Sequence, residues 1–66
     1  MSELGVKLAG LRTSLTLAEN RRKNAEISVK MASNKFVLED AQRELADSTK
    51  EVTRLQREIA ALEKPQ

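Results

Sequence analysis

Four side chains that carry much of enzyme chemistry are missing from this chain, which has no cysteine, histidine, tryptophan or tyrosine. Without histidine and cysteine, the usual general bases, thiol nucleophiles and zinc ligands are missing. The absence of cysteine also excludes disulfide bonds, and no glycine-rich phosphate-binding loop occurs. We therefore expect a protein that is not an enzyme, with no catalytic residue, cofactor, metal ion or small-molecule substrate.

Glycine and proline are scarce, and they lie near the two ends of the chain at Gly5, Gly10 and Pro65. Residues 11–64 contain no strong helix breaker, which predicts an all-α chain with Ser2 as the cap of its first helix. Because no apolar run approaches the about 20 residues of a membrane span, we expect neither a membrane contact nor a signal peptide. An aqueous compartment, by default the cytoplasm, is the expected location.

Two stripes of apolar residues run along the chain with the alternating four- and three-residue spacing of a heptad repeat. The first lies within residues 1–19, and the second lies within residues 25–64 and includes Asn34. Their phases differ by two residues, about 200° around a helix. The chain is thus one helical module with a tail at residues 65–66. The predicted interface comprises Leu4, Leu8, Leu11 and Leu15 in the first stripe and Ile27, Met31, Leu38, Ala41, Leu45, Val52, Leu55, Ile59 and Leu62 in the second.

A polar run at residues 20–24 separates the stripes and allows two interpretations. In one, this run is a loop, and Asn24 caps a second helix that extends to about residue 63, which gives an unequal hairpin. In the other, which we favour, one long amphipathic helix continues through the run, because Glu19 precedes Arg22 and Lys23 at helical pairing distance. In either case we expect assembly as an antiparallel coiled coil or helical bundle.

Residues 25–38 carry apolar side chains on two opposite faces. Ala25, Val29 and Phe36 continue the first stripe, whereas Ile27 and Met31 begin the second. A helix that is apolar all round is buried on more than one side, so we expect Val29 and Phe36 to be buried in a bundle of three or four helices. Since an isolated helix is marginal in water, the chain needs a partner, either itself as a dimer or tetramer or another helical protein.

Charge along the chain favours antiparallel packing. Residues 1–35 carry seven Lys or Arg against three acids, whereas residues 36–66 carry five against seven. Antiparallel pairing matches the g positions of the second stripe with each other, and likewise the e positions, so that Lys30 approaches Glu58 and Lys35 approaches Glu63 or Gln56. A parallel dimer would instead oppose like charges. Each exposed pair contributes under about 1 kcal/mol, so the effect is a bias.

A line of basic residues on the second stripe's outer positions indicates an alternative partner, duplex nucleic acid bound through its phosphates. Neighbouring acids and the lack of stacking aromatics make ordinary coiled-coil surface the plainer interpretation. The acidic residues at helical spacing lack the histidine typical of bundle metal sites, so we expect a solvated face at Asp40, Glu44, Asp47 and Glu51. The candidate nucleic-acid contacts are Arg21, Arg22, Lys23, Arg43, Lys50, Arg54 and Arg57.

The function that these patterns favour is a non-enzymatic coiled-coil module that self-associates in antiparallel fashion. The first alternative is a small helical dimer that binds double-stranded nucleic acid through basic helix faces. The second alternative is one strand of a hetero-oligomeric helical complex. A chain that folds as a monomer would have to form the hairpin, because only a hairpin covers an apolar stripe without a partner.

Overall fold

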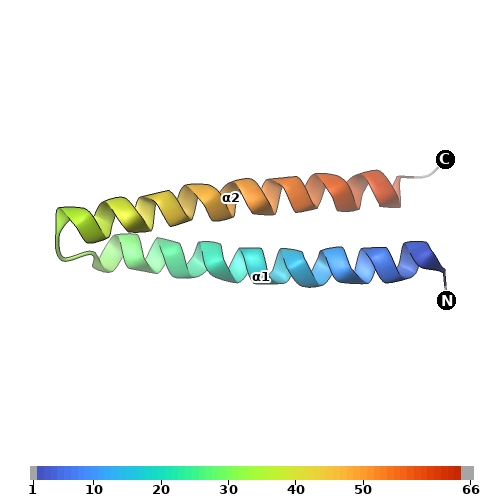
Figure 1. Ribbon diagram of the computed structural model, residues 1–66, viewed down its shortest axis with the longest axis horizontal. Helices are drawn as coiled ribbons and strands as arrows, with labels where there is room; N and C mark the ends of the chain where they lie inside the picture. The colour runs from blue at the N-terminus through green and yellow to red at the C-terminus, as the bar shows by residue number, and fades with distance from the viewer. Residues whose placement is uncertain (1, 65–66) are drawn as a thin grey trace.

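The computed structural model describes residues 2–64, which form two α-helices joined by a short turn. Helix α1 spans Glu3–Met31 and helix α2 spans Lys35–Glu63, each with 29 residues. The helices run antiparallel, so the beginning of α1 and the end of α2 lie at the same end of the hairpin (Figure 1). The expected all-α, antiparallel helical fold is confirmed. The predicted tail at residues 65–66 lies outside the described residues.

One face of each helix packs against the other along the hairpin. On α1 the contact face recurs every four and three residues from Leu8 to Val29, and on α2 from Leu38 to Leu62; these are heptad positions a and d. Leu4 continues the spacing at the start of α1 but is 46% exposed. Leu11 and Leu15 are half-buried and pack against a buried cluster. The residues buried between the helices are Ala18, Ala25, Ala41, Ser48, Val52, Leu55 and Ile59.

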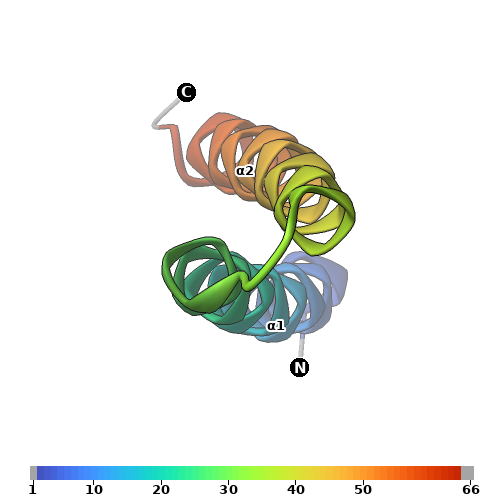
Figure 2. The same ribbon diagram turned by 90° about the vertical axis from the view of Figure 1, so that its left-hand side faces the viewer.

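Small side chains at the centre of the contact let the two helices approach closely. Ala18, Ala25 and Ala41 are buried, and Ser48 has no exposed surface. The Ser48 hydroxyl donates to the carbonyl of Glu44 at 2.8 Å, so burial leaves no unpaired polar atom there. The described chain measures 50 × 19 × 12 Å and is one helix thick, as the view from the turn shows (Figure 2). Each helix therefore has a single helical neighbour.

The turn lies at residues 32–34, so both interpretations of the polar run need correction. Asn34 is the N-cap of α2: its backbone is extended, and its side-chain oxygen accepts from the Val37 amide at 3.0 Å. Lys30 lies in the last turn of α1, where the helix dipole favours a cation. An asparagine side chain that satisfies a free helix amide favours a helix start at this position. The long helix is therefore interrupted after Met31.

Helix α1 continues through residues 20–24, which excludes a loop there. The contact face passes from Ala18 through Arg22 to Ala25 without a change of register. Arg22 is half-buried, and its guanidinium lies 3.9 Å from the carboxylate of Glu26. The aliphatic stem of Arg22 therefore covers part of the contact between the two helices, which we call the seam, while its charge stays near an acid. The prediction of a continuous helix is confirmed for this run and wrong beyond Met31.

The phase difference between the stripes coincides with the turn. Ile27 and Met31 lie on α1 and point away from its contact face, with 54% and 77% of their surfaces exposed. Asn34 caps α2 and is not a core residue. The prediction that these three residues begin the second stripe is therefore wrong, because the turn separates them from Leu38. Their participation in an interface between chains stays a prediction.

The expected burial of Val29 and Phe36 is met only in part within one chain. Val29 lies on the contact face of α1 and is half-buried. Phe36 is 79% exposed because it lies in the first turn of α2, on the side of that helix opposite the seam. A bundle of three or four helices is therefore not formed by a single copy.

Removing the cap of α2 should destabilise the hairpin. We expect Asn34→Ala to lower the free energy of unfolding by about 1 kcal/mol, because the Val37 amide loses its acceptor. Urea unfolding followed by circular dichroism measures this difference. Asn34→Ser is the matched control, since serine caps helices about as well; equal losses in both variants would contradict the assigned role.

A charge in the seam should prevent folding. Val52 is 1% exposed, and Val52→Asp would bury a carboxylate with no partner, which costs more than a hairpin of this size can supply. We expect the helical circular dichroism signal to be lost. Thr53→Asp places the same charge on the exposed neighbour and should leave the signal intact. An unchanged spectrum for Val52→Asp would refute the seam.

Candidate interaction surfaces

Beyond the seam, the hairpin presents two further surfaces, one on each helix. Both consist of heptad positions c and f, which lie opposite the a and d positions. The outer face of α1 is the set Val6, Gly10, Thr13, Leu17, Asn20, Asn24, Ile27 and Met31. The outer face of α2 is the set Phe36, Asp40, Arg43, Asp47, Lys50, Arg54, Arg57 and Ala61, and the C-cap residue Lys64 continues its line.

The seam brings the two predicted stripes together within one chain. Leu8, Leu11 and Leu15 of α1 lie on the same contact as Leu38 and Leu45 of α2, and all five are half-buried. The stripes thus cover each other, as a monomeric hairpin requires. Contact between chains through these same residues stays a prediction.

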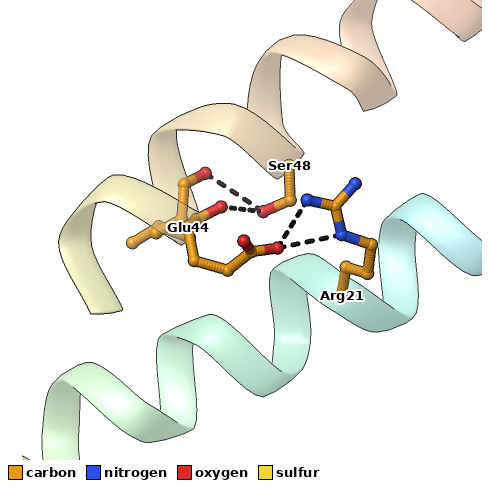
Figure 3. A network of polar contacts seen from close by, with 4 residues as sticks. Arg21, Glu44 and Ser48 are labelled. Carbon is orange, nitrogen blue, oxygen red and sulfur yellow. Dashed lines mark hydrogen bonds and ion pairs between the residues drawn. The ribbon is translucent and has the colours of Figure 1, made fainter. Parts of the chain in front are cut away.

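Two ion pairs cross the seam and agree with the antiparallel arrangement. Arg12 contacts Glu63 at 2.5 Å. Arg21 donates to one carboxylate oxygen of Glu44 through Nε at 2.9 Å and Nη2 at 2.6 Å, beside the buried Ser48 (Figure 3). The first pair joins two e positions and the second joins two g positions, the matching expected for antiparallel helices. Both pairs join the basic first half of the chain to its acidic second half.

The individual partners differ from those predicted between chains. Lys30 lies beside the turn, whereas Glu58 lies near the open end of α2, so these two residues are at opposite ends of one hairpin. Lys35 and Glu63 are likewise the first and last residues of α2. Arg12 and Arg21 pair across the seam instead. Contacts of Lys30 and Lys35 with a second copy stay a prediction.

From Val6 to Met31, the outer face of α1 carries no charged side chain; Glu3, in the first turn, precedes this stretch. Four of its members are large apolar residues that are more than half exposed: Val6 at 59%, Leu17 at 61%, and Ile27 and Met31 as given above. Asn20 and Asn24 occupy the positions between Leu17 and Ile27 and are also exposed. An ordinary solvent-facing helix surface is polar and charged, so this face is unusual for a helix that meets water.

The outer face of α2 is charged, but much of its charge is balanced locally. Arg43 lies 3.8 Å from Asp40. Arg54 pairs with Glu51 and, at 2.7 Å, with Glu58. The hydrogen bond from Arg54 holds the pKa of Glu51 below its ordinary value, and the same bond raises the pKa of Arg54. The result is a surface where positive and negative groups alternate.

The seven candidate nucleic-acid contacts are divided between the helices. Four of them pair with acids: Arg21 with Glu44, and Arg22, Arg43 and Arg54 as described. Lys50 and Arg57 share one line on α2, while Lys23 lies on α1. The structure therefore does not gather these residues into a single basic surface.

The acidic residues of α2 are also dispersed. Glu44 faces Arg21, whereas Asp40 and Glu51 pair with arginines of their own helix. Among residues 2–64, no group of three or more side chains is arranged to hold a metal ion. Over the same part of the chain, no helix has the length and apolar character of a membrane span.

The outer face of α1 was largely missed by the sequence reasoning. Its members recur with the same four- and three-residue spacing as the contact face, two residues out of phase with it. Only its end, at Ile27 and Met31, was recognised as apolar. The absence of charged side chains at its eight c and f positions between Val6 and Met31 is the sequence signal that identifies this face.

Comparison of the chain with protein-family models, with curated proteins and with solved structures found no match. The geometry of the hairpin is therefore the basis for any functional proposal.

Reversing the Arg21–Glu44 pair tests the cross-seam electrostatics. We expect Arg21→Glu to lower the free energy of unfolding by about 1 kcal/mol, because two carboxylates then face each other. The double variant Arg21→Glu with Glu44→Arg should recover most of the loss. Urea unfolding at low and high salt measures both, and the differences should shrink at high salt. A double variant as unstable as the single one would contradict this pairing.

Proposed function

We propose that this chain is a non-enzymatic helical hairpin whose role is to self-associate as an interaction module. The observation that carries the proposal is the surface that one copy leaves exposed. The accessible surface is 5302 Å², whereas a compact monomer of 7.4 kDa exposes about 4200 Å². The excess of about 1100 Å² exceeds the about 800 Å² that each partner buries in a standard interface.

The shape of the hairpin supports the same conclusion. A pair of helices that is 12 Å thin cannot enclose large side chains on all sides. Of the buried residues, only Val52, Leu55 and Ile59 are larger than alanine or serine. Chains of this length rarely gain more than about 3–5 kcal/mol from one core. Association with a further copy would add the missing burial.

The two apolar stripes from which we predicted self-association pack against each other within one chain. The copies would therefore meet through other surfaces, and the expected contacts of Lys30 and Lys35 with a second copy are not needed. Assembly of two hairpins gives a four-helix dimer, which agrees with the expected dimer or bundle. The relative direction of the two copies depends on which of the outer faces forms the contact between them.

Binding of duplex nucleic acid is the weaker alternative. It requires basic groups free to contact phosphates along one surface. Arg43 and Arg54 already have carboxylate partners, and Asp40 and Asp47 lie on the same outer face of α2 as Lys50 and Arg57. A negatively charged polymer would meet these acids. We therefore favour the interaction module.

Sedimentation equilibrium of the unaltered chain over a wide concentration range tests the proposed function. We expect a discrete dimer or tetramer, with the apparent mass rising with concentration as mass action requires. A chain that remains a monomer at every concentration would overturn self-association and favour one strand of a hetero-oligomeric complex. Circular dichroism of the same samples shows whether the monomer is folded.

A further inference from the structure

We propose that the outer face of α1 is the surface on which a second copy of this chain packs, α1 against α1. This inference rests on the proposed function and adds the interface through which the copies meet. The outer face of α2 then remains in contact with water on both sides of the assembly.

The contrast between the two outer faces is the first argument. Between Val6 and Met31, all eight c and f positions of α1 are uncharged, whereas six of the eight c and f positions of α2 are charged, the other two being Phe36 and Ala61. The two helices have equal lengths and experience the same solvent in one hairpin. A difference in composition at equivalent positions indicates that the two faces have different neighbours.

The shape of the apolar surface favours a helix as the neighbour. Its four large apolar side chains, Val6, Leu17, Ile27 and Met31, lie along one strip of α1 and are more than half exposed. An apolar strip along one face of a helix is typically covered by another helix. A Cβ at Gly10 would meet nothing within 4 Å, so the face is open there in one copy.

The two asparagines favour a second copy as that helix. Asn20 and Asn24 lie at the middle of this face, where an apolar partner would leave their amide groups without hydrogen bonds. A carboxamide both donates and accepts, so it pairs well with another carboxamide. If the copies run antiparallel, the register that places Asn20 opposite the second copy's Asn24 overlaps the two faces over residues 13–31. If they run parallel, each asparagine lies opposite its own equivalent and the faces overlap from Val6 to Met31. Self-pairing of asparagine in a heptad seam also selects a defined register.

The length of the face suits an extended contact between two helices. From Val6 to Met31 it extends for about 38 Å at 1.5 Å per residue. Leu17 lies near its centre, and Ile27 lies one turn before Met31. The chain as a whole exposes about 1100 Å² more than a compact monomer of its mass, and this face contributes to that excess. Contact of the two copies would bury the large apolar side chains of this face.

The closing experiment uses two charge substitutions on exposed positions of the full chain. Leu17→Glu with Ile27→Glu places unpaired carboxylates on the proposed interface, and both positions are more than half exposed in the hairpin. The matched control is Ala46→Glu with Thr53→Glu, which adds the same charge to exposed positions of α2. Sedimentation equilibrium gives the dissociation constant of each dimer, and circular dichroism reports helix content.

The substitutions on α1 should raise the dissociation constant by at least about a hundredfold, because two buried charges would lack partners. The control should dissociate like the unaltered chain, and both variants should keep their helix content. If the α1 variant still forms a dimer of unaltered strength, this inference is wrong while self-association stands. If the unaltered chain is itself a monomer, the proposed function fails as well.

Single cysteines provide a second measurement, since the chain has none of its own. Under mild oxidation, Asn24→Cys should form a disulfide-linked dimer if the α1 helices run parallel, and an equal mixture of Asn20→Cys and Asn24→Cys should form a mixed dimer if they run antiparallel. Lys50→Cys, on the outer face of α2, is the control and should not cross-link above a monomeric background. Cross-linking through position 50 alone would overturn the proposal.

Discussion

The contact between one face of α1 and one face of α2 is the interaction on which the rest of the structure depends. Neither helix is expected to persist alone in water, because most helical stability in proteins comes from the packing of an apolar face. Small residues such as Ala18 and Ser48 bring the backbones close, and Val52 and Leu55 fill the space between them. Because this contact covers only one face of each helix, the opposite faces are left for contact with water or with another molecule.

The short turn at residues 32–34 makes the two helices antiparallel, and the charges of the chain are placed in agreement with that arrangement. The cross-seam pairs at Arg12 and Arg21 match e with e and g with g, which is possible only when the helices run in opposite directions. On α2, the alternation of Arg54 with Glu51 and Glu58 gives a surface that carries charge without a strong field of one sign. These pairs are exposed and individually weak, and their effect is on solubility more than on stability.

The predicted cap at Ser2 is confirmed, because its hydroxyl accepts a hydrogen bond from the Gly5 amide at 3.1 Å. The heptad spacing predicted the all-α class and most of the residues on the two faces that meet, since periodic burial leaves a direct trace in the sequence. It did not predict the turn, because Ala32, Ser33 and Asn34 include no glycine or proline and Asn34 also fits a heptad position. The charged run at residues 20–24 instead allowed the prediction of a loop there. Arg22 remains in the seam because its long aliphatic stem packs against the other helix while its charge stays near the surface. The spacing did not predict the outer face of α1 as an interface, because glycine, threonine and asparagine interrupt its apolar residues.

The common location of the beginning of α1 and the end of α2 determines how the hairpin would respond to mechanical tension (Figure 1). A pull applied to these two ends acts across the seam rather than along it. The load then falls on one layer of contacts at a time, starting near Leu4 and Leu62 and moving toward the turn at Asn34. Separating the contacts one layer at a time needs far less force than sliding two helices past each other. The helices would therefore separate progressively from the open end and pack again starting from the turn.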